Sequence, residues 1–393
     1  MRSLMLQRAA PYAILCRLYG CFFIHNFRGN SLRNAKVNWK TPYTIYSLSC
    51  LGLYLILEEM YATRVAYVIR NISDTLSKYL LLVIYGVVMV KIIANLAVML
   101  AKPNKLLAFF RKSEVFETNT GFSPRTHSLQ HSTFHRWNAV RAIWVFMAFV
   151  LYFAEAERFL IAELTRSMPP QKSVPLAIFG FIMGSGFIVY DSLSYVFLRC
   201  CTNVIVEYIQ VELQGFQEAG KLQNFHLHSQ SPREIEATRL RVNNIRKLKE
   251  SFNEIWEGPL ILVCASTIMV DCVVLDAIFH DGMREELWLA AAYSLYSSLC
   301  FIDLAYTGQS LFDEVRKLKS TILMVPAFET PDCYLQQLHY LHENVDPEGM
   351  CLGGGGFFVL KKSLLVPMTG SIIIFGVILV QTSNTLALKI NAT

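Results

Sequence analysis

The side chains best suited to chemistry are charged groups that lie inside long apolar stretches of the chain. They are Lys91, Arg141, Glu155, Glu157, Arg158, Asp191, Asp271, Asp276 and Asp303. If these stretches cross a membrane, an ionisable group at that depth is energetically expensive and faces protein or water rather than lipid. The charges therefore indicate either a site for a ligand or ion, or pairs that hold helices together.

Motifs for metal binding or catalysis are weak. His127, His131 and His135 recur every four residues and would share one helix face, as zinc ligands can. No cysteine or carboxylate stands close by, so an exposed polar helix is the better interpretation and no metal is expected. The four glycines at 353–356 lack a following Gly-Lys-Ser/Thr and indicate a hinge. No nucleophile or zinc-hydrolase motif occurs, so we predict no enzyme, no catalytic residue and no cofactor.

The composition is typical of a polytopic membrane protein. Of 393 residues, 53% are hydrophobic and only 17% are charged, too few to cover a soluble protein of this size. Several stretches of about 20 residues, long enough to cross a hydrocarbon core of about 30 Å, are almost free of charge. We predict an all-α membrane protein with seven transmembrane helices, at 43–66, 76–101, 138–163, 174–202, 259–280, 286–309 and 363–388.

Basic residues give this protein an orientation. They concentrate before the first span and in the loops at 102–137, 203–258 and 310–362, and they are few in the alternate loops. Because cytoplasmic loops are rich in Lys and Arg, the N-terminus is predicted to be cytoplasmic and the C-terminus extracellular. Sequons at Asn71 and Asn391 fall outside, and we expect glycosylation at Asn71. The net charge of +6 follows from the basic loops, so no nucleic-acid partner is inferred.

The predicted segments follow this topology along the chain. Residues 1–42 form a cytoplasmic amphipathic segment, 43–202 the first four spans, and 203–258 a cytoplasmic extension of helices four and five. Residues 259–309 form spans five and six, and 310–362 a cytoplasmic anchor helix with the glycine-rich hinge. Residues 363–393 form the last helix and a short extracellular tail.

A cluster of aromatic and acidic residues falls in the predicted outer halves of the spans. An aromatic-walled cavity with a few polar groups suits a small ligand. The candidate ligand-binding residues are Tyr85, Tyr152, Glu155, Phe187, Asp276, Trp288, Tyr293 and Tyr296. Interhelical pairing, for example of Arg158 with Glu155, is the alternative for any one of the charged groups.

The last helix carries one stripe of small and polar residues on an otherwise apolar surface. At about 100° per residue, one face holds Gly370, Ile374, Val377, Gln381, Asn384, Thr385 and Leu388. Such a stripe is either a helix-packing seam or, with several copies around an axis, the lining of a pore. The stripe alone favours the seam.

The C-terminal region resembles the signature of arthropod gustatory receptors, which changes that balance. Gly356, Phe357 and Phe358 match the aromatic approach to the last helix of this family. Ser363, Leu364 and Leu365 match its Ser-Leu-Leu step. In the last helix Gln381 matches the family glutamine and Phe375 stands at the tyrosine, while Ile374 and Thr382 depart from the motif.

The resemblance implies a tastant-gated, poorly selective cation channel in the plasma membrane, assembled as a homotetramer or as a heteromer with related receptors. The last helix of each subunit would line a central pore, a tastant would bind outward-facing among helices two to six, and cations and membrane lipid would be the other partners. The pore residues would be Gln381 with Val377, Asn384, Ile374 and Thr385.

Two other classes of seven-helix or multi-span protein are alternatives. A G-protein-coupled chemoreceptor would have the opposite orientation, and neither an Asp-Arg-Tyr-like triplet nor Asn-Pro-x-x-Tyr occurs. A transporter would be indicated by repeated, Gly/Pro-interrupted helices, which the sequence does not show. An odorant-receptor channel would share the fold and mechanism.

Overall fold

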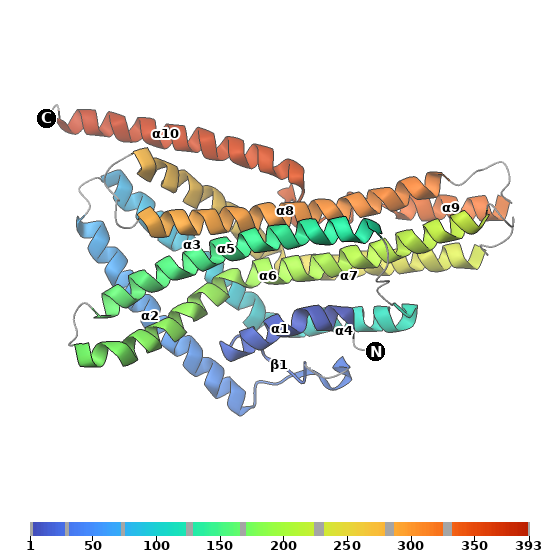
Figure 1. The fold of residues 1–393 in the computed structure, drawn as a ribbon, viewed down its shortest axis with the longest axis horizontal. Coiled ribbons are helices and arrows are strands. Elements are labelled where there is room, and N and C mark those ends of the chain that lie inside the picture. The colour runs from blue at the N-terminus through green and yellow to red at the C-terminus, as the bar shows by residue number, and fades with distance from the viewer. Residues whose placement is uncertain are drawn as a thin grey trace.

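The chain forms an elongated helical bundle (Figure 1). The computed structural model describes residues 3–27, 31–71, 75–122, 129–165, 170–223, 232–279, 287–324 and 332–391. The elements are α1 (Leu4–Leu18), β1 (Ile24–His25), η1 (Leu32–Asn34), β2 (Lys36–Val37), α2 (Pro42–Asn71), α3 (Thr75–Ala101), α4 (Pro103–Thr120), α5 (Leu129–Thr165), α6 (Pro170–Gln223), α7 (Pro232–Phe279), α8 (Leu287–Leu323), α9 (Asp332–Asn344), β3 (Gly353–Gly354), β4 (Phe358–Val359), η3 (Lys362–Leu364) and α10 (Leu365–Asn391).

Helices α5 to α8 form the centre of the bundle. α8 packs against α5, α6 and α7, while α3 packs on α6 and α7 and α2 covers α6 and α3. Midway along the bundle, Phe197 of α6 stacks on the buried Trp256 of α7, with ring centroids 5.4 Å apart. α6, α7 and α8 are each longer than one membrane crossing needs, and the cytoplasmic extension at 203–258 stays a prediction.

The prediction of an all-α membrane fold is confirmed. Within the described residues, five helical stretches are long and apolar enough to cross a membrane, at Lys78–Ala101, Arg136–Arg158, Arg233–Ile278, Trp288–Leu323 and Lys362–Thr382. The other two predicted spans, 43–66 and 174–202, lie within α2 and α6. The count of seven crossings, with the orientation of the termini, stays a prediction.

The N-terminal helix is part of the bundle. α1 packs against α4 and α6, and most of its apolar side chains are buried. Its first N–H groups need acceptors, which Glu117 on α4 supplies: Leu4 N lies 2.6 Å and Met5 N 3.1 Å from its two carboxylate oxygens. The segment expected to be amphipathic is therefore buried on one side by protein.

The glycine-rich stretch is a hairpin rather than an open hinge. β3 pairs antiparallel with β4, and Leu360 N donates to Leu352 O over 2.8 Å. Gly355 and Gly356 have φ angles of 57° and 76°, in a region that favours glycine. Asn253 on α7 accepts from Gly353 N at 3.0 Å and holds the hairpin against the bundle. The glycines serve a tight turn that leads into η3 and α10.

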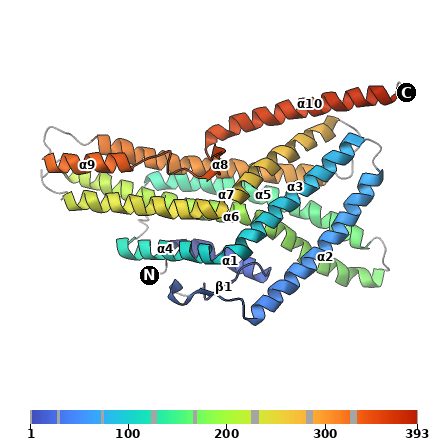
Figure 2. The same cartoon turned by 180° about the vertical axis from the view of Figure 1, so that it is seen from behind.

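Of the five stretches of membrane length in the described residues, the one in α10 is the least covered, and α10 runs along one side of the molecule (Figure 2). It packs mainly on α7, where a Cβ on Gly376 would lie 3.2 Å from a Leu275 methyl carbon. Ile373, Ile374 and Val377 are exposed. The start of α10 is held by α8, because Gly308 lets the backbone at Leu360 approach α8 closely.

Replacing Gly308 with Ala is expected to destabilise the protein by roughly 1–3 kcal/mol, because a Cβ there overlaps the Leu360 carbonyl oxygen and the backbone must shift. Thermal unfolding of the purified protein in detergent measures this as a lower Tm. Gly215→Ala, at an exposed position of α6 with nothing within 4 Å of the added carbon, is the control and should preserve or raise the Tm. An equal Tm for both variants would contradict the close approach.

Candidate functional site

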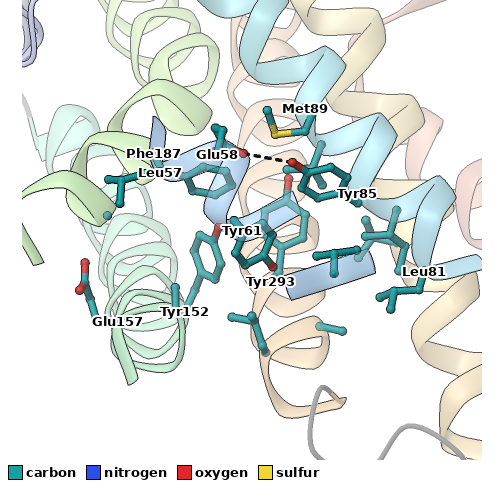
Figure 3. A pocket seen from close by; sticks show the side chains of 18 of the residues that line it. Leu57, Glu58, Tyr61, Leu81, Tyr85, Met89, Tyr152, Glu157, Phe187 and Tyr293 are labelled. Atoms are coloured by element: carbon teal, nitrogen blue, oxygen red, sulfur yellow. Dashed lines mark hydrogen bonds between the residues drawn. The ribbon is translucent and has the colours of Figure 1, made fainter. Parts of the chain in front are cut away.

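A cavity of about 160 Å³ lies among α2, α3, α5, α6, α7 and α8 (Figure 3). It sits in the half of the bundle where α2 ends, α3 begins and α8 begins, which is the predicted outer half. Its lining residues are Tyr54, Leu57, Glu58, Tyr61, Val65, Leu81, Ile84, Tyr85, Val88, Met89, Tyr152, Ala156, Glu157, Gly184, Phe187, Val270, Leu289, Ala290 and Tyr293. A mostly apolar cavity with a few polar groups has the character of a small-molecule site.

Aromatic rings form much of the cavity wall. The rings of Tyr61 and Tyr85 lie 5.7 Å apart between centroids, and those of Tyr152 and Tyr293 lie 5.1 Å apart. Figure 3 shows Phe187 on the same side as Leu57 and Glu58. These rings come from five helices, so the cavity depends on how the helices pack rather than on one local motif.

Two carboxylates belong to this wall. Glu58 on α2 is largely buried, and the Tyr85 hydroxyl donates to its Oε2 over 3.3 Å. Glu157 on α5 is 5% exposed, and neither of its carboxylate oxygens has a hydrogen-bond partner among the described residues. A buried carboxylate without a partner is costly, so Glu157 is an unusual group in this position.

A buried ion pair lies next to the cavity and contacts one of its lining residues. Lys91 Nζ on α3 lies 2.6 Å from Asp191 Oδ1 on α6, with side chains 5% and 0% exposed. Lys91 also donates to the Tyr293 hydroxyl over 2.8 Å, and that hydroxyl lies 3.3 Å from Asp191 Oδ1. The three groups join α3, α6 and α8, and one of them, Tyr293, also lines the cavity.

A second charge cluster lies further along α8, away from the cavity. Asp303 accepts hydrogen bonds from Arg141 Nε of α5 at 2.9 Å and from Arg199 Nε of α6 at 2.6 Å. The Tyr195 hydroxyl adds a third donor at 3.0 Å. One buried carboxylate therefore joins α8 to two neighbouring helices, with both guanidinium groups in charge-assisted contacts.

The model of the family described as trehalose receptor matches residues 189–390, just over half of the chain. The chain belongs to the trehalose receptor family. These are insect chemoreceptors of the gustatory type, so the resemblance carried by the C-terminal residues is confirmed. The matched region covers the second half of α6 and all of α7, α8, α9 and the α10 helix almost to its end.

Solved structures show that the receptor shares its fold with an insect olfactory receptor. The olfactory receptor OR5 from Machilis hrabei in complex with eugenol has a TM-score of 0.70 at 12% sequence identity, covering 96% of this chain and 98% of that one. A second structure of the same olfactory receptor has a TM-score of 0.69 at 14% identity and the same coverage.

The predicted ligand-binding residues fall into two groups in this receptor. Tyr85, Tyr152, Phe187 and Tyr293 line one cavity, and Tyr296 stacks behind Tyr152 with ring centroids 5.5 Å apart. The other three predicted residues do not line the cavity. Glu155 pairs with Arg158 at 2.8 Å, and Trp288 is 68% exposed. Asp276 is buried within α7.

The predicted pore residues lie on α10. Ile374, Val377 and Gln381 are exposed on this helix, while Asn384 and Thr385 belong to α10 but their side chains are outside the described part. Asn71 is the last residue of α2, and its side chain is likewise not described. His127 also falls outside the described residues.

Sequence reasoning missed the contribution of α2. Tyr54, Glu58 and Tyr61 all line the cavity. The signal was present in Glu58, an acidic residue inside the predicted span 43–66, and the rule applied to the other intramembrane charges would have singled it out. The spacing of three and four residues puts these side chains on one face of the helix.

Replacing Lys91 with Met is expected to destabilise the receptor by about 3–5 kcal/mol, because Asp191 is left as a buried, uncompensated charge. Adding Asp191→Leu should restore much of the loss, since the double variant buries no lone charge. Thermal unfolding in detergent measures both.

Lys105→Met is the matched control, because Lys105 pairs with Glu254 in an exposed ion pair whose side chains are 55% and 65% exposed. That variant should change stability by less than about 1 kcal/mol. If Lys91→Met behaved like this control, the buried pair would not have the structural role assigned to it.

Proposed function

We propose that the receptor is a tastant-gated, poorly selective cation channel of the plasma membrane, with its N-terminus inside and its C-terminus outside. Four subunits, identical or from related receptors, would surround one pore lined by α10. A small molecule would bind in the cavity among α2, α3, α5, α6, α7 and α8 and favour the open state.

The observation that carries this proposal is the uncovered face of α10. Ile374, Val377 and Gln381 are exposed there, although the opposite side of the helix packs on α7. A helix with an amide and small residues on an exposed, mostly apolar face suits the wall of a pore shared by several copies, with hydrophobic rings and an amide ring. Asn384 and Thr385 would continue this lining.

α8 is the element through which the cavity would act on the pore. It carries Tyr293 at the cavity, Asp303 in the second charge cluster, and Gly308 against the backbone that leads into α10. A ligand opens a channel only if it binds the open state more tightly than the closed one. A shift from about 1% to 99% open needs about 5.5 kcal/mol in total, which four cavities would share.

The size and lining of the cavity bear on the ligand. The family name points to the disaccharide trehalose, whose surface is covered with hydroxyl groups. A cavity of about 160 Å³ with mainly aliphatic and aromatic walls instead favours a smaller, less polar molecule. A G-protein-coupled receptor or a transporter finds no specific support in these observations.

Replacing Gln381 with Lys is expected to abolish ligand-evoked cation current or shift its selectivity toward anions, because four ammonium groups would meet at the amide ring. Whole-cell recording with ion substitution measures this effect. Thr382→Lys places the same charge at the next, exposed position of α10 and should leave selectivity unchanged. A Gln381→Lys channel with normal cation selectivity would remove α10 from the pore.

A further inference from the structure

The cavity contains negative charge that no lining residue balances. Among its described lining residues there are two carboxylates, Glu58 and Glu157, and no Lys, Arg or His. The nearby cations are already engaged: Lys91 lies 2.6 Å from Asp191, and Arg158 lies 2.8 Å from Glu155. The described lining therefore holds two acidic side chains and no basic side chain to balance them.

Burial makes this imbalance energetically significant. Glu58 is 9% exposed and Glu157 is 5% exposed, and water is largely excluded from both side chains. A buried carboxylate is stabilised by a nearby positive charge far more than an exposed one is, because the surrounding dielectric is low. A cation that enters the cavity would supply the charge that the protein lacks there.

The aromatic wall is suited to the same type of ligand. The faces of tyrosine rings carry partial negative charge and attract an ammonium group within about 6 Å of the ring centroid. Tyr61 and Tyr85 lie 5.7 Å apart on one side, and Tyr152 lies in the wall that Glu157 shares. In size, an apolar cavity of about 150 Å³ in another protein holds one benzene ring, close to the volume found here.

We propose that this cavity binds a small organic cation, a protonated primary amine on a body about the size of a single ring. Its ammonium group contacts the Glu58 carboxylate, beside the hydroxyl that Tyr85 already directs at Oε2. Glu157 adds a second negative charge in the same wall, and the apolar part of the ligand packs against the tyrosine and phenylalanine rings. This inference names the class of ligand, and it rests on the proposed function only in taking this cavity as the place where the ligand binds.

Calorimetric binding of phenethylamine to the purified full-length protein in lipid nanodiscs tests the inference. 2-Phenylethanol is the matched neutral probe, because it replaces the ammonium with a hydroxyl at nearly the same size. The amine should bind roughly tenfold or more tightly than the alcohol, as expected for a hydrogen bond between charged groups. Equal affinities would overturn the inference, because a neutral, protonated Glu58 would not distinguish the amine from the alcohol. A failure of the amine to bind would also overturn it.

Variants assign the effect to residues. Glu58→Gln should remove the preference for the amine while it keeps the affinity for 2-phenylethanol, which shows that the cavity remains folded. Glu157→Gln should reduce the preference in part. Glu155→Gln, on the same helix but paired with Arg158 outside the cavity, should leave it unchanged. An amine preference that survives in Glu58→Gln would contradict the assignment.

Current recordings separate this inference from the channel proposal. Tight amine binding without any evoked current would contradict the channel and leave the ligand class intact. Currents evoked by 2-phenylethanol as effectively as by phenethylamine would support the channel and contradict the ligand class.

Discussion

The buried ion pair of Lys91 and Asp191 is the constraint on which the half of the bundle that holds the cavity depends. Inside an apolar bundle each charge would be costly alone, so α3 and α6 must stay close enough to keep the 2.6 Å contact. Tyr293 brings α8 into the same contact by accepting from Lys91. Three helices are thereby fixed relative to one another, and Tyr293 of this contact also lines the cavity.

The Asp303 cluster repeats this arrangement toward the predicted cytoplasmic side. There one carboxylate of α8 holds an arginine of α5 and another of α6. α8 thus contributes Tyr293 to one buried cluster and Asp303 to the other. A few residues further on, Gly308 of α8 touches the backbone at Leu360, which precedes α10. A change in the cavity that moves α8 would reach η3 and the start of α10, while the body of α10 packs mainly on α7.

The helical architecture can be predicted from the sequence because apolar runs of membrane length leave few alternatives. The predicted spans coincide with the long helices, and the candidate residues from four helices meet at one cavity. Partners were harder to predict. Nothing in the sequence tells that Glu155 turns to Arg158 three residues on while Glu157 turns to the cavity, or that Trp288 lies outside it, because these choices depend on helix rotation and packing. The tight turn at Gly355 and Gly356 was also not predictable, because only the positive φ angles in the structure identify it.

Substituted-cysteine accessibility at Gln381 tests the central claim, that ligand binding opens a pore lined by α10. A positively charged methanethiosulfonate reagent applied to cells expressing Gln381→Cys should block the evoked current, and should do so faster while ligand is present. Thr382→Cys, one position away on the exposed helix, should be far less sensitive. A reagent effect that is absent at Gln381→Cys, or independent of ligand, would contradict the account.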